Sequence, residues 1–312
     1  MKRTQLTLPT TDELAINVYK WENKQSQPRG VIQIAHGMAE HALRYEEFSQ
    51  FLTDNGWVIY ANDHRGHGQT IANVDDKGFF ANENGFDKVV HDMKLLSDKI
   101  KDDYPHLPLF IFGHSMGSFL TRRYVQIFNN DIAGIILSGT GGSKGVIGKV
   151  GLQIAKFERW RTGARTPSPL LDKLTFGQYN KEFSPARTKF DFLSRDEKQV
   201  DKYIADDLCG FICTAGFFVD LISGLDKIHQ KQEMDKVNRS LPIFIISGDK
   251  DPVGDNGKGV KEVYEELYNR QENLTMKLYE GARHELINET NHLEVYEDIL
   301  FWLNSNVEEK VI

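Results

Sequence analysis

The sequence has few cysteines, and the two it contains are close together. Cys209 and Cys213 are the only ones among 312 residues, and they stand four residues apart in an apolar segment. This spacing predicts two small buried side chains on one helix face rather than a disulfide or a metal site. No second Cys/His pair stands nearby to complete a zinc site. We therefore expect a reduced protein of the cytoplasm.

Long hydrophobic runs are also missing. A transmembrane helix needs roughly 18 to 20 mostly apolar residues, and no stretch of the chain approaches that length. The first residues, MKRTQLTLPTTDELAINVY, place no apolar segment behind the two basic side chains, so they do not resemble a secretory signal. We expect neither a membrane span nor a cleaved leader.

Basic residues do not predominate. Lys and Arg together number 38 and Asp and Glu 45, which gives a net charge of −7. Proteins that hold nucleic acid through its phosphates carry the opposite balance, so we expect no nucleic-acid partner. Electrostatic docking to an anionic membrane is disfavoured for the same reason, although a local apolar patch could still make transient contact with lipid.

What the chain does contain is an alternation of short apolar runs with segments of helical period. The apolar runs are 31–36, 57–62, 109–115, 132–139, 241–249 and 274–282. Two segments show an apolar face at helical spacing. One face consists of Phe86, Val89, Val90, Met93, Leu96 and Ile100, and the other of Leu293, Tyr296, Leu300 and Leu303. The middle four runs are typical of strands buried on both faces. With TQLTL and LAINVYKW as an antiparallel edge hairpin, the order predicts an α/β fold with a mostly parallel eight-stranded sheet flanked by helices.

This alternation breaks between residues 142 and 236. The stretch contains mixed helical segments, one of which, 211–225, is unusually apolar. Because it follows the carboxyl end of a strand, where the sites of α/β proteins lie, we expect a helical lid inserted into a core made of 1–141 and 237–312. A helical decoration that only packs on the core is the alternative.

The clearest motif is Gly-His-Ser-Met-Gly, residues 113–117, between an apolar run and a helical segment. That context is the one a nucleophile elbow requires. Ser115 would occupy a strained turn, and Gly113 and Gly117 would lack the Cβ atoms that collide where strand and helix approach. The helix that follows would point its first amides at developing negative charge. A serine N-cap between two glycines is the simpler interpretation.

A serine hydroxyl needs a base and an orienting carboxylate, and both follow later strands. His284 stands just after the run that ends at residue 282, which predicts the general base. Asp249 and Asp251 both follow the preceding run. Asp249 comes directly after Gly248, where it could cap the turn, so we favour Asp251 as the partner of the histidine. The chain order Ser, Asp, His is the order of this fold.

Two further turns follow strands. In HGMAEH, residues 36–41, the backbone N–H of Met38 could donate to an oxyanion, together with that of Met116 after the nucleophile. His36 there could hold the loop by a hydrogen bond. DHRGHGQT, residues 63–70, is interpreted as a structural turn with a possible pair between Asp63 and Arg65.

Taken in order, HGMAEHALRYEEF, DHRGHGQT, GHSMGS, GDKDPVG and GARHEL resemble the monoacylglycerol lipase and lysophospholipase branch of the α/β-hydrolases, of serine aminopeptidase S33 type. The resemblance implies a triad of Ser115, Asp251 and His284, oxyanion amides at Met38 and Met116, and hydrolysis of a lipid-like ester through an acyl-enzyme. It also implies a lid that admits an acyl chain, with Phe211, Phe217, Phe218, Leu221 and Ile222 as candidate contacts. It implies no metal and no organic cofactor.

Other functions fit the same scaffold. An aminopeptidase-like amide hydrolase would need lid carboxylates for a substrate amine, and the acids at 206, 207 and 220 could serve. A thioesterase is a second rival. A catalytically silent, ligand-binding relative is a third, but such proteins usually lose a triad member and none is missing here. The apolar segment 211–225 favours an acyl chain. Oligomeric state does not follow from the sequence.

Overall fold

The computed structural model describes residues 1–25, 27–71, 73–128 and 132–308. An eight-stranded sheet runs through its centre in the order β1-β2-β4-β3-β5-β6-β7-β8. The strands are β1 (Lys2–Pro9), β2 (Ala15–Glu22), β3 (Gly30–Ala35), β4 (Trp57–Asn62), β5 (Leu109–His114), β6 (Gly134–Ser138), β7 (Ile243–Gly248) and β8 (Leu274–Tyr279). At one edge β1 pairs antiparallel with β2 and β2 pairs antiparallel with β4, whereas β3 to β8 are all parallel to one another. The predicted fold class is confirmed.

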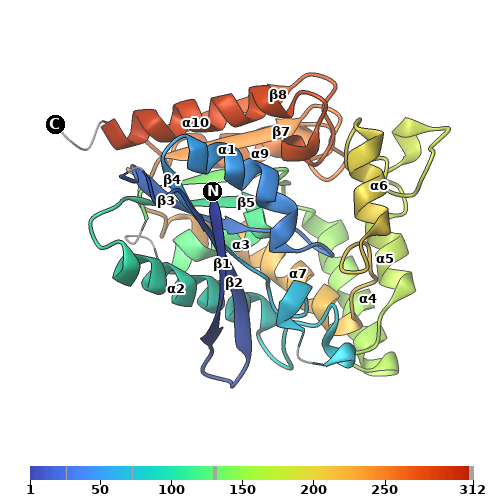
Figure 1. Cartoon of the computed structure of the whole chain (residues 1–312). Coiled ribbons are helices and arrows are strands. Elements are labelled where there is room, and N and C mark those ends of the chain that lie inside the picture. Colours follow the sequence, from blue (N-terminus) through green and yellow to red (C-terminus); the bar gives the residue numbers. More distant parts are fainter. Residues whose placement is uncertain (26, 72, 129–131, 309–312) are drawn as a thin grey trace.

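Helices cover both faces of the sheet (Figure 1). They are α1 (Glu46–Asp54), α2 (Gly85–Asp103), α3 (Met116–Ile127), α4 (Gly145–Thr162), α5 (Pro169–Phe176), α6 (Glu197–Ala205), α7 (Ala215–Ile228), α8 (Lys231–Met234), α9 (Lys258–Tyr268) and α10 (His292–Glu308), with short 3-10 helices at Ala42–Tyr45, Gly68–Thr70, Val74–Asp76, Lys181–Phe183 and Leu286–Asn288. Strand β5 shows how the layers form, because successive side chains point to opposite faces. Ile111 packs with α2, α3 and α7, whereas Phe110 and Phe112 pack with α1 and α10.

The parallel strands are apolar because both of their faces are covered. Every residue of β3 to β7 is buried. Strand β1 at the edge instead alternates exposed with half-buried positions. The two kinds of strand therefore have the two sequence patterns expected of central and edge positions.

One predicted helix face is partly wrong. In α10, Tyr296 and Leu303 are buried, but Leu293 is 59% exposed. The helix begins at His292, and its buried stripe runs through Val295, Tyr296, Ile299, Trp302 and Leu303. Leu293 lies in the first turn, off that stripe.

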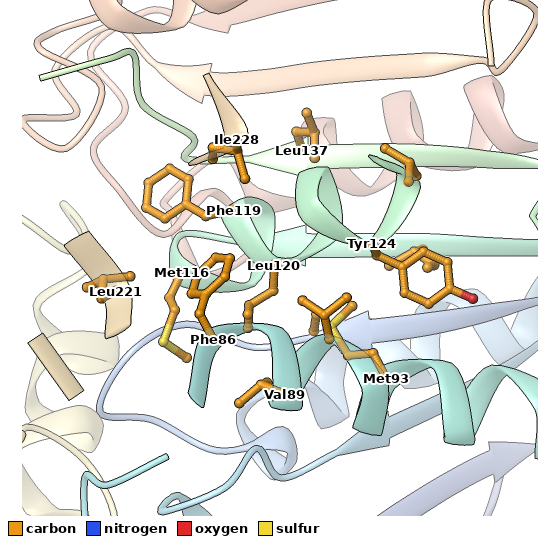
Figure 2. Close-up of a cluster of buried hydrophobic side chains, with 14 of the residues drawn as sticks. Phe86, Val89, Met93, Met116, Phe119, Leu120, Tyr124, Leu137, Leu221 and Ile228 are labelled. Atoms are coloured by element: carbon orange, nitrogen blue, oxygen red, sulfur yellow. The ribbon is translucent and has the colours of Figure 1, made fainter. Parts of the chain in front are cut away.

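The helices between β6 and β7 fall into two groups. Helices α4, α5 and α6 lie together at one end of the sheet, as Figure 1 shows. Helix α7 instead joins the largest core cluster, and Figure 2 shows its Leu221 and Ile228 among the same buried side chains as Met116 and Phe119. The apolar character of α7 therefore reflects burial between helices, since a helix that is apolar on most sides is a buried one.

The connection between α6 and α7 carries both cysteines. Cys209 and Cys213 are buried and free, as expected, but neither lies in a helix, so the predicted helical pairing is wrong. Within the described residues, no helix combines the length and the apolar character that crossing a membrane requires.

Candidate active site

Ser115 stands in a sharp turn between β5 and α3. Its backbone has φ 52° and ψ −120°, a conformation that residues with a Cβ rarely adopt. The turn is held from both sides, because the Ser115 amide donates to the Ser138 carbonyl at 2.8 Å and the Ser118 amide donates to the Ser115 carbonyl at 2.8 Å. A strained residue fixed by its surroundings is typical of a functional position.

The flanking glycines let the strand and helix approach each other. A Cβ on Gly117 would lie 2.0 Å from the Ala35 carbonyl oxygen, and one on Gly113 would lie 2.4 Å from Thr121 Oγ1. No real Cβ tolerates such contacts, so both positions require glycine. The local packing is the one predicted for a nucleophile elbow.

His284 and Asp251 meet at the same end of the sheet. His284 Nδ1 lies 2.9 Å from Asp251 Oδ2, although the two residues are 33 positions apart. Asp251 is fully buried, and its Oδ1 also accepts the Val253 amide at 2.9 Å. Asp249 instead accepts the Gly281 amide at 2.8 Å. Thus Asp249 caps the turn and Asp251 holds the histidine, which is the division that the sequence favoured.

The charges of this pair stabilise each other. Burial alone would lower the pKa of His284, but the Asp251 carboxylate and its hydrogen bond raise that pKa above its usual value. Burial would likewise raise the pKa of Asp251, yet the His284 partner and the Val253 amide bring it below its usual value. His114 stays neutral, because burial and the nearby His284 lower its pKa to about 4. The arrangement favours an ionised aspartate beside a basic imidazole.

Ser115 and His284 line one cavity of about 260 Å³, between the sheet end and the helices that follow β6. Met38 lines it too, and Met116 is the first residue of α3. Within the described parts of the chain, neither of these two amides donates to a protein acceptor. Both N–H groups are therefore unused by the described protein groups, and the residue that carries one of them, Met116, directly follows Ser115 in the chain.

A buried ion network fixes the loop that carries Met38. Arg44 donates to Glu40 Oε2 at 2.6 Å and to both carboxylate oxygens of Glu285 at 2.6 and 2.7 Å. Glu40 in turn accepts the Gly37 amide and the Tyr45 hydroxyl. Because Glu285 follows His284 directly, one guanidinium joins the loop of Met38 to the loop of the histidine. Sequence reasoning missed this network, although all of its members lie within the motifs HGMAEHALRY and GARHEL.

The turn 63–70 is structural, but its predicted pairing is wrong. Asp63 does not contact Arg65; it accepts the Ala42 amide at 2.9 Å and the Asn17 side chain at 2.9 Å. Arg65 points the other way, to Asp92 and Asp12. The physical reason is that partners on different elements hold the two side chains: Asp63 faces β2 and the 3-10 helix at 42–45, whereas Arg65 faces α2 and the turn between β1 and β2.

His36 behaves as the predicted loop holder. Its Nε2 accepts the His64 amide at 2.9 Å, and its Nδ1 lies 2.7 Å from the Gly37 carbonyl. Burial keeps the pKa of His36 well below its usual value, so the ring is neutral. The start of the Met38 loop is thereby tied to the turn that follows β4.

The apolar wall of the cavity differs from the predicted one. Of the five candidates only Phe211 lines it; Phe217, Phe218, Leu221 and Ile222 of α7 pack in or against the core instead. The wall is made by Phe176, Phe190, Phe192, Leu193, Tyr203 and Ile212. Phe176 and Tyr203 lie on the helices α5 and α6, but the other four lie in irregular segments, where periodicity could not single them out.

Three carboxylates line the cavity: Glu40 and Glu285, which Arg44 binds, and Asp172, which the sequence had not suggested. Asp172 on α5 lies there, half-buried, and burial raises its pKa. Asp206, Asp207 and Asp220 do not line this cavity. Asp206 lies 2.8 Å from His41, and Asp220 accepts the first amide of α2 at 3.2 Å.

Comparison with known proteins agrees with this geometry. The family model described as serine aminopeptidase, S33, matches residues 26–291. The chain is 28% identical to a monoacylglycerol lipase of Mycolicibacterium smegmatis over 93% of each chain. It is also 28% identical to a monoglyceride lipase of Homo sapiens, over 89% of this chain and 83% of that protein.

Solved structures give the same picture. A thermostable carboxyl esterase from Bacillus coagulans, crystallised with glycerol, superposes with a TM-score of 0.91 at 27% identity. The match covers 98% of this chain and 99% of that one. The whole architecture, including the helices after β6, is therefore shared.

The close approach at Gly117 yields a prediction about folding. Gly117→Ala should lower the midpoint of urea unfolding by the equivalent of about 1–3 kcal/mol or more, because a backbone carbonyl occupies the Cβ position. Gly151→Ala on α4 is the matched control, since its Cβ would meet nothing within 4 Å. That variant should be unchanged or about 0.5–1 kcal/mol more stable. Equal effects at the two positions would contradict the packing described for the turn.

Proposed function

The chain belongs to the serine aminopeptidase S33 family and is a serine ester hydrolase of the α/β-hydrolase fold, and from that premise we propose that it cleaves a lipid-like ester, a monoacylglycerol or lysophospholipid, through an acyl-enzyme on Ser115. The observation that carries the proposal is the buried His284–Asp251 pair, whose histidine lines the same cavity as the strained Ser115. The two monoglyceride-type relatives point to the same class of substrate.

The mechanism assigns one role to each group. His284 takes the hydroxyl proton of Ser115 as the oxygen attacks the ester carbonyl, and Asp251 keeps the imidazole oriented and stabilises its charged form. The amides of Met38 and Met116 donate to the oxyanion, a contribution worth about 3–4 kcal/mol per donor in comparable enzymes. His284 then protonates the leaving alcohol, and a water molecule releases the acid by the reverse sequence.

The cavity wall supports an acyl substrate. Aromatic and aliphatic side chains dominate the lining, and such surfaces bind alkyl chains through burial of apolar area. An amine-binding site is less well supported, because Asp206, Asp207 and Asp220 lie outside the lining. Asp172 does favour it in one respect, since a half-buried carboxylate could accept an ammonium group as well as the hydroxyls of a glycerol. A substrate panel must therefore include an amide and a thioester.

We also propose that the helices before α7 act as a lid that touches lipid. Helix α4 exposes Val146, Ile147, Val150, Phe157 and Trp160, and α5 exposes Leu170 and Leu174. The α4 sequence GVIGKVGLQIAKFERWRT contains four basic residues and one acid, in contrast to the net charge of −7 for the chain. An amphipathic helix with apolar and basic side chains is typical of a lipid surface. Because α5 also lines the cavity, this surface borders the entrance for a substrate.

Replacement of the nucleophile tests the assignment directly. Ser115→Ala should reduce hydrolysis of a monoacylglycerol and of a p-nitrophenyl ester by at least about 10³-fold, with an unchanged thermal midpoint. The measurement is kcat/KM for a panel of monoacylglycerols, lysophospholipids, short esters, a thioester and an aminoacyl anilide, together with labelling by a fluorophosphonate. Undiminished ester turnover by the variant would refute the role of Ser115. A higher kcat/KM for the anilide than for every ester would refute the substrate class.

The pKa shifts predict the acid limb of the pH profile. The base must be neutral to accept a proton, so activity should fall as the pH drops through the pKa of His284, which lies above its ordinary value of 6.5. Asp251→Asn removes the charge that raises this pKa, so the residual activity should have its acid limb at lower pH. The measurement is kcat/KM from about pH 5 to about pH 9. A limb that stays in place or moves upward would show that Asp251 does not set the pKa of the base.

The lipid-facing surface has its own test. Ile147→Ser combined with Trp160→Ser should reduce partition onto phospholipid vesicles at least about tenfold, since each side chain contributes about 1.5–3 kcal/mol when buried. Turnover of a water-soluble short ester should not change. Phe301→Ser on α10 is the matched control, because Phe301 is 76% exposed against 80% for Trp160 and its helix α10 lies away from α4 (Figure 1). An equal loss of partition in the control would count against a lipid-binding lid.

A further inference from the structure

Three side chains that can bind metal meet outside the catalytic cavity. His41 ends the loop that carries Met38, and Asp206 and Cys209 lie in the connection between α6 and α7. His41 Nε2 is 2.8 Å from Asp206 Oδ2, and the nitrogen, oxygen and sulfur atoms of the three residues all lie within 4.8 Å of one another. The cluster was invisible in the sequence, because the histidine is 165 positions from the aspartate.

The donor set suits a thiophilic divalent cation. Zn²⁺ takes thiolate, imidazole and carboxylate ligands at about 2.0 to 2.3 Å in tetrahedral geometry, which places ligand atoms about 3.3 to 3.7 Å apart. The present spacing reaches that geometry with side-chain shifts of less than about 1 Å on this comparison. A thiolate and an imidazole together favour zinc over the calcium or magnesium that an all-oxygen set would bind.

The cluster also has an entrance and a free coordination position. His41 and Asp206 line a surface groove on the outer side of the ion network, together with Arg44 and Lys202. The His41 side chain is 8% exposed and that of Asp206 36% exposed, whereas Cys209 is buried behind them. A cation entering from the groove therefore meets the carboxylate and imidazole first and the sulfur last, and water can occupy its fourth position.

The surrounding charge tolerates a cation. Arg44 lines the same groove, but Glu40 and Glu285 both bind it, so these three groups sum to −1. Asp206 adds another negative charge. On binding, the proton of the Cys209 thiol is released to solvent as the sulfur–metal bond forms, as is usual for cysteine ligands.

We propose that His41, Asp206 and Cys209 form a binding site for a Zn²⁺-like cation, and that its occupation slows ester hydrolysis by displacing the Met38 loop. The two halves of the site already touch, since the Ala39 carbonyl accepts the Gly210 amide at 2.9 Å and the Tyr203 hydroxyl at 3.0 Å. Metal ligation would add bonds on both sides of this contact. Met38 lies only three residues before His41, so movement of His41 toward the metal would shift the Met38 amide from the position in which the Arg44 network holds it. The effect on turnover rests on the proposed function, whereas the binding does not.

Binding is tested with Zn²⁺ and Co²⁺ and two matched cysteine variants. The wild-type chain should take up one equivalent of Zn²⁺ in competition with a chromophoric chelator, and its Co²⁺ form should show a thiolate-to-cobalt charge-transfer band. Cys209→Ser should lose the band and weaken binding by about tenfold or more. Cys213→Ser, which removes the other buried thiol, should keep both. Absence of the band in the wild type, or its survival in Cys209→Ser, would overturn the site.

Regulation is tested separately with a water-soluble ester. Zn²⁺ should lower kcat of the wild type and of Cys213→Ser, and chelator should restore it, whereas Cys209→Ser should be insensitive at the same concentration. Equal inhibition of Cys209→Ser would show that zinc acts elsewhere, for example on the His284 imidazole, and would overturn the regulatory role. Failure of the Ser115 assignment would leave the binding results unaffected, so the two proposals fail independently.

Discussion

The buried guanidinium of Arg44 holds together the two loops on which the candidate site depends. One loop carries Glu40 and the amide of Met38, and the other carries Glu285 directly after His284. Two carboxylates share one positive charge in a place with almost no water, and removal of one partner of such a buried pair typically costs about 3–5 kcal/mol. The network thus sets the relative position of two groups that the chemistry requires within a fraction of an ångström. The packing of the sheet brings the two loops near each other, and the ion pairs of Arg44 fix their position relative to one another.

Much of the fold could be predicted from the sequence, because parallel strands and their helices leave strong periodic patterns. The triad was predictable for a related reason: carboxyl ends of parallel strands meet at one edge of a sheet, so residues just after separate strands lie together. The distinction between Asp249 and Asp251 also followed from local chemistry, because a residue next to a glycine turn is well placed to accept turn amides. The catalytic roles themselves stay predictions.

The rest depended on contacts between segments far apart in the chain. The apolar α7 was interpreted as substrate-binding, but an apolar segment shows only that it is buried, and not against what. Asp63 and Arg65 are two positions apart and yet face opposite elements, which no spacing rule reveals. The aromatic wall of the cavity comes from irregular segments such as 190–193 and 211–212, where neither period two nor period 3.6 applies.

Ser115 has a consequence for how such a protein can lose its chemistry. Its backbone lies in a region where glycine is comfortable and serine is not, at a cost on the order of 1–3 kcal/mol. A glycine at this position would therefore give a catalytically inactive chain with a higher free energy of unfolding than the serine-containing protein. Stability alone would favour the disappearance of the hydroxyl from this turn. The presence of serine in so unfavourable a conformation implies that selection has preserved reactivity, although a more stable and inactive protein was available by a single substitution.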